Sequence, residues 1–164
     1  MSRREPGRLG HHEVAAGAVH FAGAWSAYGP LSAGPEGLRY FTLRNRWDPG
    51  ARYMELPENR SARRARPRQH RESVGMIAVA TDGLCVEQLV VASGEPITGI
   101  DPASGAGQFW LALSGHMISE NTAVQPKSCL FVSPDEPPFA AIAGADGATL
   151  LLLQFPRDSR PVDR

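Results

Sequence analysis

Three side chains in the second half of the chain are of the types that move protons in enzymes. His116 follows a glycine at an expected turn into a strand, and Asp135 and Glu136 stand in the turn after Pro134. Imidazole and carboxylate groups at the rim of a pocket can serve as general acid and general base. We therefore take His116, Asp135 and Glu136 as candidate catalytic residues, although nothing in the sequence orients them toward one substrate.

Other residues with reactive side chains lack a supporting pattern. His11, His12 and His20 could suggest a metal site, but their spacing fits no helix-face pair and they lie near a loose terminus, which favours solvated histidines. Ser114 and Ser133 have no histidine and aspartate at a recognisable spacing, so the sequence predicts no catalytic triad. A metal-bound or serine-nucleophile enzyme is therefore not indicated.

The charges are balanced overall but unevenly placed. The net charge is zero; residues 1–82 hold 13 arginines against 8 acids, and residues 83–164 hold 4 basic residues against 9 acids. The arginine-rich segment 60–71 could contact nucleic acid or an acidic partner. However, the absence of interleaved aromatic residues favours a solvated segment, so we expect no nucleic acid. The preference for arginine over lysine is typical of a GC-rich bacterial genome.

Composition indicates a globular protein of the cytoplasm. Apolar residues make up 42% of the chain and charged residues 21%, which is not the composition of a disordered protein. No apolar run has the roughly 18 residues of a membrane helix, and no apolar segment with a cleavage site follows Met1. We expect no membrane partner. The two cysteines, Cys85 and Cys129, lie in apolar strand-like runs and predict no disulfide framework.

The pattern of turns predicts an all-β fold. The 17 glycines and 14 prolines leave little room for long helices, and apolar runs recur at roughly ten-residue spacing. Residues 11–28 are ambiguous between a weak helix and a strand, and Pro67 favours an exposed loop over residues 58–72. The expected strands are residues 38–46, 74–80, 84–92, 108–113, 116–119, 128–132, 139–143 and 148–155.

Residues 84–156, a little under half of the chain, resemble the cupins, a family of small jelly-roll barrels. The first cupin motif places His-x-His five residues after a glycine, then a glutamate, then a second glycine. Here Gly94 and Gly115 take the glycine positions, the segment 100–102 stands where His-x-His belongs, and Gln108 takes the glutamate position.

The second cupin motif is matched in spacing but not in its key side chains. Ser128 stands for its first glycine, Pro134 keeps its proline, and Phe139 and Ala143 stand for its histidine and asparagine. In the family, three histidines and a glutamate hold a divalent metal. The matching positions here are Ile100, Pro102, Gln108 and Phe139, which are poor ligands. We therefore expect no metal and no cofactor.

The former ligand positions can still line a pocket. Side chains alternate across a strand, so Trp110 shares the inward face with Gln108. An apolar, aromatic cavity with one or two amides is the composition of a small-molecule site. The alternative is that these side chains simply fill the barrel. The candidate ligand-binding residues are Ile100, Pro102, Gln108, Trp110, Phe139 and Gln154.

The fold predicted from this resemblance is a cupin-like double-stranded β-helix, or jelly-roll barrel, with an N-terminal extension. We expect an extension over residues 1–37, a barrel domain over residues 38–156 and a tail over residues 157–164. Because cupins commonly dimerise through their N-terminal segments, the resemblance implies a homodimer.

Three functions remain open at this point. The first is a metal-free protein that binds a small apolar or aromatic organic molecule in the barrel. The second is a metal-independent isomerase, cyclase or lyase that acts in the same pocket, with His116, Asp135 or Glu136 moving protons. The third is an interaction or regulatory module with a filled barrel, whose working surface is the arginine-rich segment 60–71.

Overall fold

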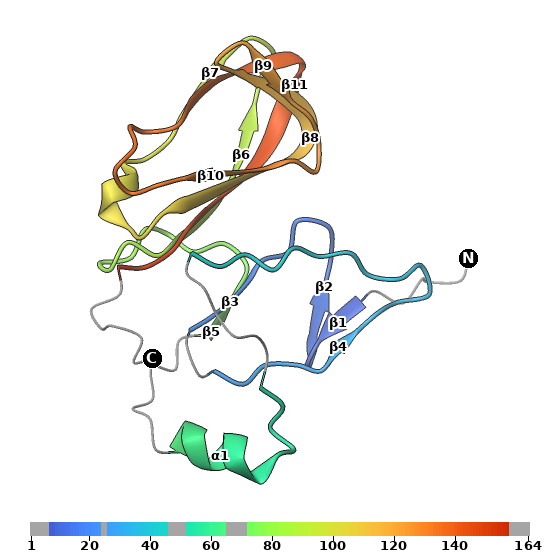
Figure 1. The fold of residues 1–164 in the computed structure, drawn as a ribbon. Helices are drawn as coiled ribbons and strands as arrows, with labels where there is room; N and C mark the ends of the chain where they lie inside the picture. Colours follow the sequence, from blue (N-terminus) through green and yellow to red (C-terminus); the bar gives the residue numbers. More distant parts are fainter. Residues whose placement is uncertain (1–6, 24–25, 46–51, 65–71, 158–164) are drawn as a thin grey trace. The chain divides into compact units, whose positions relative to one another are not determined.

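A computed structural model describes residues 7–23, 26–45, 52–64 and 72–157 (Figure 1). The chain divides into two compact units, Met1–Gly75 and Met76–Arg164. Strands dominate the described residues, which confirms the prediction of a β-rich protein. Among the described residues, no helix is long and apolar enough to span a membrane.

The N-terminal unit contains two small antiparallel sheets. One has the strand order β2-β1-β4, formed by β1 (Gly7–Leu9), β2 (His12–Val14) and β4 (Leu31–Ser32). The other pairs β3 (His20–Ala22) with β5 (Glu72–Val74). Strands therefore resolve the ambiguity over residues 11–28. The pairing of β3 with β5 places His20 opposite Val74, so the N-terminal unit extends to Gly75. The boundary between the units therefore differs from residue 38, where a barrel domain was expected to begin.

Two local expectations in the N-terminal unit were wrong. Residues 38–45 form no strand, because the strand preference of their side chains is realised only where a sheet accepts them. The segment expected to be a loop begins with helix α1 (Pro57–Arg64). Pro57 is tolerated in the first turn, where its missing N–H would have no helical partner, and Glu58 suits the positive N-terminal end. Residues 65–71, including Pro67, lie outside the described residues.

The C-terminal unit is built on one antiparallel sheet with the strand order β10-β8-β11-β6. Two further short strands, β7 and β9, extend it by pairing with β11 and β8; neither was expected from the sequence. A single 3₁₀ turn, η1 (Pro102–Ser104), follows β7. The strands are β6 (Cys85–Val91), β7 (Pro96–Thr98), β8 (Gln108–Ser119), β9 (Thr122–Val124), β10 (Cys129–Val132) and β11 (Ala140–Gln154).

The two longest strands each merge two of the expected short ones. Turns were expected within β8 and β11, but both strands continue through these positions. Their pairing is irregular there, with a register shift between Ala143 and Ala148. Gly115 and Gly147 adopt positive φ angles of 65° and 72° there. A Cβ atom at Gly115 would lie 2.1 Å from the carbonyl oxygen of Gly147, so only glycine fits this crossing. Glycine thus bends these strands without ending them.

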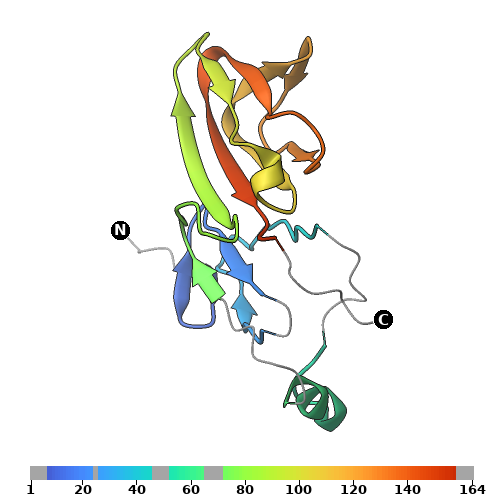
Figure 2. The same cartoon turned by 90° about the vertical axis from the view of Figure 1, so that its left-hand side faces the viewer.

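One face of this sheet carries the hydrophobic core. Trp110, Met117, Leu150 and Leu152 are fully buried members of the core cluster. Leu89 and Val91 of β6 pack against the same cluster but are only half-buried. The core is therefore well covered over β8 and β11 and less covered at the β6 margin of the sheet (Figure 2).

Candidate functional site

The two interior glutamines form the centre of a hydrogen-bonded chain. Gln108 at the start of β8 and Gln154 at the end of β11 face each other in the strand register. Nε2 of Gln108 donates to Oε1 of Gln154 at 2.8 Å and to the carbonyl oxygen of Ile100 at 3.0 Å. Nε2 of Gln154 donates to the carbonyl oxygen of Gly83 at 2.7 Å and to Oγ of Ser104 at 3.0 Å. The solvent-exposed fractions of the two side chains are 0% and 1%.

Trp110 connects this chain to the aromatic part of the core. Its Nε1 donates to Oε1 of Gln108 at 3.1 Å, and its ring lies against Phe139 with centroids 4.7 Å apart. Pro102 is also buried, and Ile100 packs against the core cluster. The structure therefore brings together five of the six residues that the sequence singled out for ligand binding, namely Ile100, Gln108, Trp110, Phe139 and Gln154.

The glutamine chain is tightly enclosed by glycines. A Cβ atom at Gly105 would lie 2.4 Å from Cγ of Gln154, and one at Gly99 would lie 2.8 Å from Cζ2 of Trp110. Gly83, whose carbonyl accepts from Gln154, has a φ of 90°, and a Cβ atom there would lie 2.1 Å from the carbonyl oxygen of Ser104. These glycines let the backbone close directly onto the two buried side chains.

This arrangement favours a filled core over a hollow one at these six residues. Both Nε2 hydrogens of each glutamine are used within the protein, and Trp110 occupies the remaining amide oxygen of Gln108. Among the described residues, no buried side-chain nitrogen or oxygen lacks a hydrogen-bond partner. A ligand entering here would have to replace hydrogen bonds that are already made.

The donor chemistry of this interior does not suit a metal. Isoleucine, proline and phenylalanine have no lone pair to offer, and the amide of Gln108 is committed to its neighbours. In the part of the chain that the structure describes, no group of three or more His, Cys, Asp or Glu side chains lies close enough together to hold a metal ion. Two of the N-terminal histidines, His11 and His12, stack on each other with ring centroids 3.9 Å apart.

His116 lies at the irregular crossing of β8 and β11. The next residue, Met117, is buried in the core, so alternation along the strand turns His116 to the opposite face. Its imidazole covers Gly144, where a Cβ atom would lie 2.0 Å from Nε2 of the ring. His116 is therefore packed over the backbone of β11 rather than directed into the hydrophobic core.

Asp135 and Glu136 are held by Ser133 in the loop between β10 and β11. The hydroxyl of Ser133 donates to the carboxylate of Asp135, and its backbone N–H donates to the carboxylate of Glu136. The hydrogen bond from Ser133 lowers the pKa of Asp135 below its ordinary value. Both carboxylates are exposed, and they order the turn that they share with Ser133.

The three candidate catalytic residues do not form one cluster. Val132, just before the Ser133 loop, pairs with Gln108 at the first residue of β8. His116 lies eight residues further along that strand, which corresponds to roughly 25 Å of strand length. Among the described residues, no hydrogen bond or ion pair joins His116 to Asp135 or Glu136. The predicted acid–base site is not assembled.

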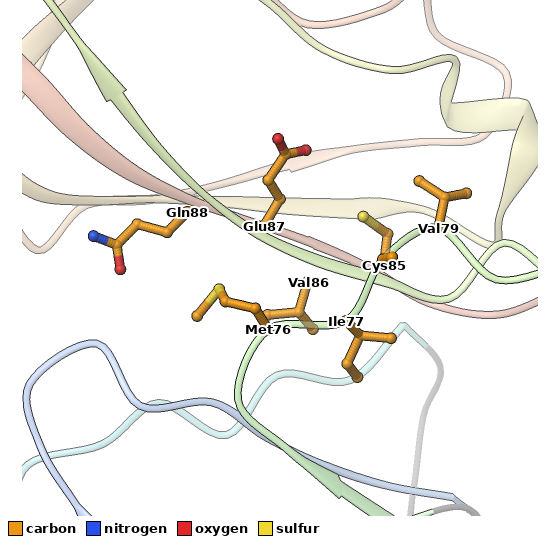
Figure 3. Close-up of a pocket in the computed structure, with 8 residues that line it drawn as sticks. Met76, Ile77, Val79, Cys85, Val86, Glu87 and Gln88 are labelled. Atoms are coloured by element: carbon orange, nitrogen blue, oxygen red, sulfur yellow. The ribbon is translucent and has the colours of Figure 1, made fainter.

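A pocket of about 380 Å³ lies beside the first half of β6 (Figure 3). It follows a hairpin in which Ile77 and Val86 exchange two backbone hydrogen bonds, of 2.8 and 2.9 Å. In Figure 3 the side chains of Val79, Cys85 and Glu87 project to one side of this hairpin. The lining residues are Met76, Ile77, Ala78, Val79, Cys85, Val86, Glu87 and Gln88.

The pocket is chemically apolar, with one acidic group. Glu87 is the single charged residue among those that line it. Met76 and Val79 expose about half of their surface, so both are accessible to a ligand in the pocket. Cys85 is buried, and burial, followed by the charge of Glu87, raises the pKa of its thiol. The thiol is therefore a neutral part of the lining at neutral pH.

Sequence reasoning did not single out this pocket. The available signal was two neighbouring apolar segments, residues 74–80 and 84–92, joined by a Thr-Asp-Gly turn. They were both expected to be strands, and a regular hairpin would leave no space between them. The structure pairs them through a single isolated bridge, and the pocket lies along this irregular pairing.

Comparisons with known proteins do not add to this picture: no protein-family model, curated protein or solved structure matches the chain significantly.

Proposed function

We propose that the C-terminal unit is a cupin-like jelly roll without the metal site, and that it binds a small apolar or aromatic organic molecule without transforming it. The grouping of Ile100, Gln108 and Phe139 with Trp110 supports the fold, because these are three of the positions where cupins hold their metal. Because the interior is packed, we propose the pocket beside β6 as the ligand site.

The observation that carries this proposal is the composition of that pocket. The pocket is partly open to solvent, its volume is about 380 Å³, and six of its eight lining residues are apolar. Burying an apolar ligand against such a lining is favourable in proportion to the area removed from water. Glu87 disfavours anions, so the ligand class is neutral or cationic.

Binding is favoured over catalysis by the placement of the proton-transfer groups. An isomerase, cyclase or lyase needs an acid and a base within hydrogen-bond reach of one substrate. His116 is packed over Gly144, and Asp135 and Glu136 are engaged by Ser133. The pocket itself offers one carboxylate and a neutral thiol.

A fluorescence titration with N-phenyl-1-naphthylamine, a neutral aromatic probe, tests this function. The full chain is expected to bind the probe saturably with a large gain in emission. Val79→Glu places a charge in the lining at a side chain that is 56% exposed, so folding should survive. We expect it to weaken binding at least tenfold, because an apolar ring would then desolvate a carboxylate.

Ile142→Glu is the matched control, since Ile142 is 52% exposed and lies outside the pocket. It should bind like the unmodified chain. Absence of saturable binding, or equal binding by the Val79 variant and the control, would reject the pocket as the ligand site. Circular dichroism of each variant confirms that the fold is retained.

A further inference from the structure

The free edge of β6 has backbone groups that no described residue pairs with. β6 is the last strand of the sheet order β10-β8-β11-β6, and Figure 2 shows it at the margin of the sheet. Val86 uses both its N–H and its C=O on Ile77, on the side away from β11. Backbone direction alternates along a strand, so Gln88 and Val90 also face that side. Among the described residues, nothing pairs with them there.

Beyond Glu87, this edge has few of the features that usually prevent pairing with another chain. Natural edge strands are commonly short or carry lysine or proline. The opposite edge strand, β10, has four residues and is followed closely by Pro134. β6 has seven residues with neither proline nor lysine, and five of them are apolar. Val90 exposes 78% of its surface.

The sequence of β6 is complementary to itself. In an antiparallel pair of two copies centred on Leu89, Gln88 of each copy faces Val90 of the other, so their free N–H and C=O groups form four hydrogen bonds. Glu87 faces Val91, and no two like charges are opposed. The half-buried Leu89 and Val91 would then cover the open margin of both cores.

This register also fits the neighbouring hairpin. Pairing centred on Leu89 brings the end of one β6, at Val91, opposite Glu87 of the other copy. The edge beyond that point, at Val86, is already occupied by Ile77. β6 ends at Val91, and the chain turns at Glu95, whose N–H donates to the carbonyl oxygen of Ala92. Met76 precedes Ile77 and lines the pocket together with Glu87 and Gln88, so the paired strand ends beside Met76.

We propose that two copies of this chain associate through the free edge of β6, in an antiparallel, two-fold symmetric pair with Leu89 at the axis. This surface differs from the N-terminal segments through which cupins commonly dimerise. Glu87 and Gln88 belong both to this edge and to the lining of the pocket, but the association rests on the backbone groups of Gln88 and Val90 rather than on a ligand.

Analytical ultracentrifugation of the full chain at about 100 µM tests the association. The expected mass is twice the 17.7 kDa of one chain. Val90→Pro removes an N–H that no strand of the monomer uses, which edge strands tolerate, and it should shift the protein to monomer. Val90→Thr keeps the N–H and the branched shape and should remain dimeric. A monomeric unmodified chain would overturn the proposal and leave this edge to a different protein. A dimer that Val90→Pro does not dissociate would also overturn it.

Oxidative cross-linking tests the register without relying on the proline variant. Residues directly opposite in a non-hydrogen-bonded antiparallel pair have Cα atoms about 4.5 Å apart, within the range of a disulfide. Leu89→Cys should therefore give a covalent dimer faster than Gln88→Cys or Val90→Cys. In the proposed pairing residue 89 lies directly opposite residue 89 of the other copy, whereas residue 88 lies opposite residue 90. Equal or faster cross-linking at 88 or 90, or none at 89, would reject this pairing. Val79→Glu should leave the dimer intact, which separates this test from that of the pocket.

Discussion

The interior of the C-terminal sheet and its β6 edge differ in how completely their polar groups are used. In the interior, Gln108, Gln154 and Trp110 satisfy each other and the surrounding backbone, with almost no exposed surface. At the edge, Gln88 and Val90 present backbone groups that the described residues leave unpaired, next to an apolar pocket.

The comparison shows that a reactive side-chain type is not enough for a functional site. The side chain or backbone group must also be free of partners within the protein. A buried amide attracts attention in a sequence because burial without partners costs free energy. Here the hydrogen-bond partners of both amides are other groups of the protein, so the amides fix the packing of the interior. The β6 edge has no catalytic or metal-binding motif in its sequence. Its backbone groups and apolar side chains are nevertheless accessible to a ligand or to another chain.

Loss of Trp110 should give the largest effect in the interior. Trp110→Ala removes a side chain with 0% exposure that stacks on Phe139 and donates to Gln108. We expect the free energy of unfolding to fall by about 3–5 kcal/mol. Val79→Ala, at an exposed position of the pocket, should change it by about 0.5 kcal/mol or less. Urea unfolding measures both, and similar values for the two variants would remove the contrast between interior and edge.

The glutamine pair should show strong coupling. Gln154→Leu leaves Nε2 of Gln108 with one fewer acceptor, and Gln108→Leu leaves Oε1 of Gln154 without its donor. Each single change should cost about 1–3 kcal/mol, because a buried polar group loses its partner. The double variant should cost clearly less than the sum of the two. Strict additivity in a double-mutant cycle would mean that the two amides act separately.

The smallest expected effect concerns the loop at the end of β10. Because the hydrogen bond from Ser133 lowers the pKa of Asp135, Ser133→Ala should raise that pKa toward the ordinary value. A lowered folded-state pKa contributes stability above the unfolded value, near about 3.9, and this contribution is lost as the pH falls through the folded value. The variant should therefore be slightly less stable than the unmodified chain above that pH, and the difference should vanish in acid. An NMR titration of the Asp135 carboxyl group measures the shift; no change would mean that the hydroxyl does not hold the carboxylate.

The sequence predicted the C-terminal unit better than the N-terminal one, for a physical reason. Runs such as residues 84–92 and 148–155 have the apolar content of buried strands, and β6 and β11 lie within or across them. The glycines expected to end strands, such as Gly115 and Gly147, instead bend β8 and β11. Residues 38–45 have strand-forming side chains but join no sheet, since pairing depends on distant residues.

The packed interior cluster was predicted in part from the sequence, whereas the pocket beside β6 was not. Alternation along β8 correctly placed Trp110 on the face of Gln108, and the cupin spacing brought Phe139 beside them. Whether such residues surround a space or fill it depends on the hydrogen bonds of two side chains 46 residues apart, which no local pattern encodes. The separation of His116 from Asp135 likewise follows from strand register, not from spacing in the chain.

The most direct test of this account measures unfolding and probe binding together on two variants. Gln154→Leu should lose about 1–3 kcal/mol of unfolding free energy and keep its affinity for N-phenyl-1-naphthylamine. Val79→Glu should keep its stability and lose affinity at least tenfold. The opposite result, with the Gln154 variant stable but unable to bind and the Val79 variant binding normally, would contradict the account and move the binding site to the interior around Gln108.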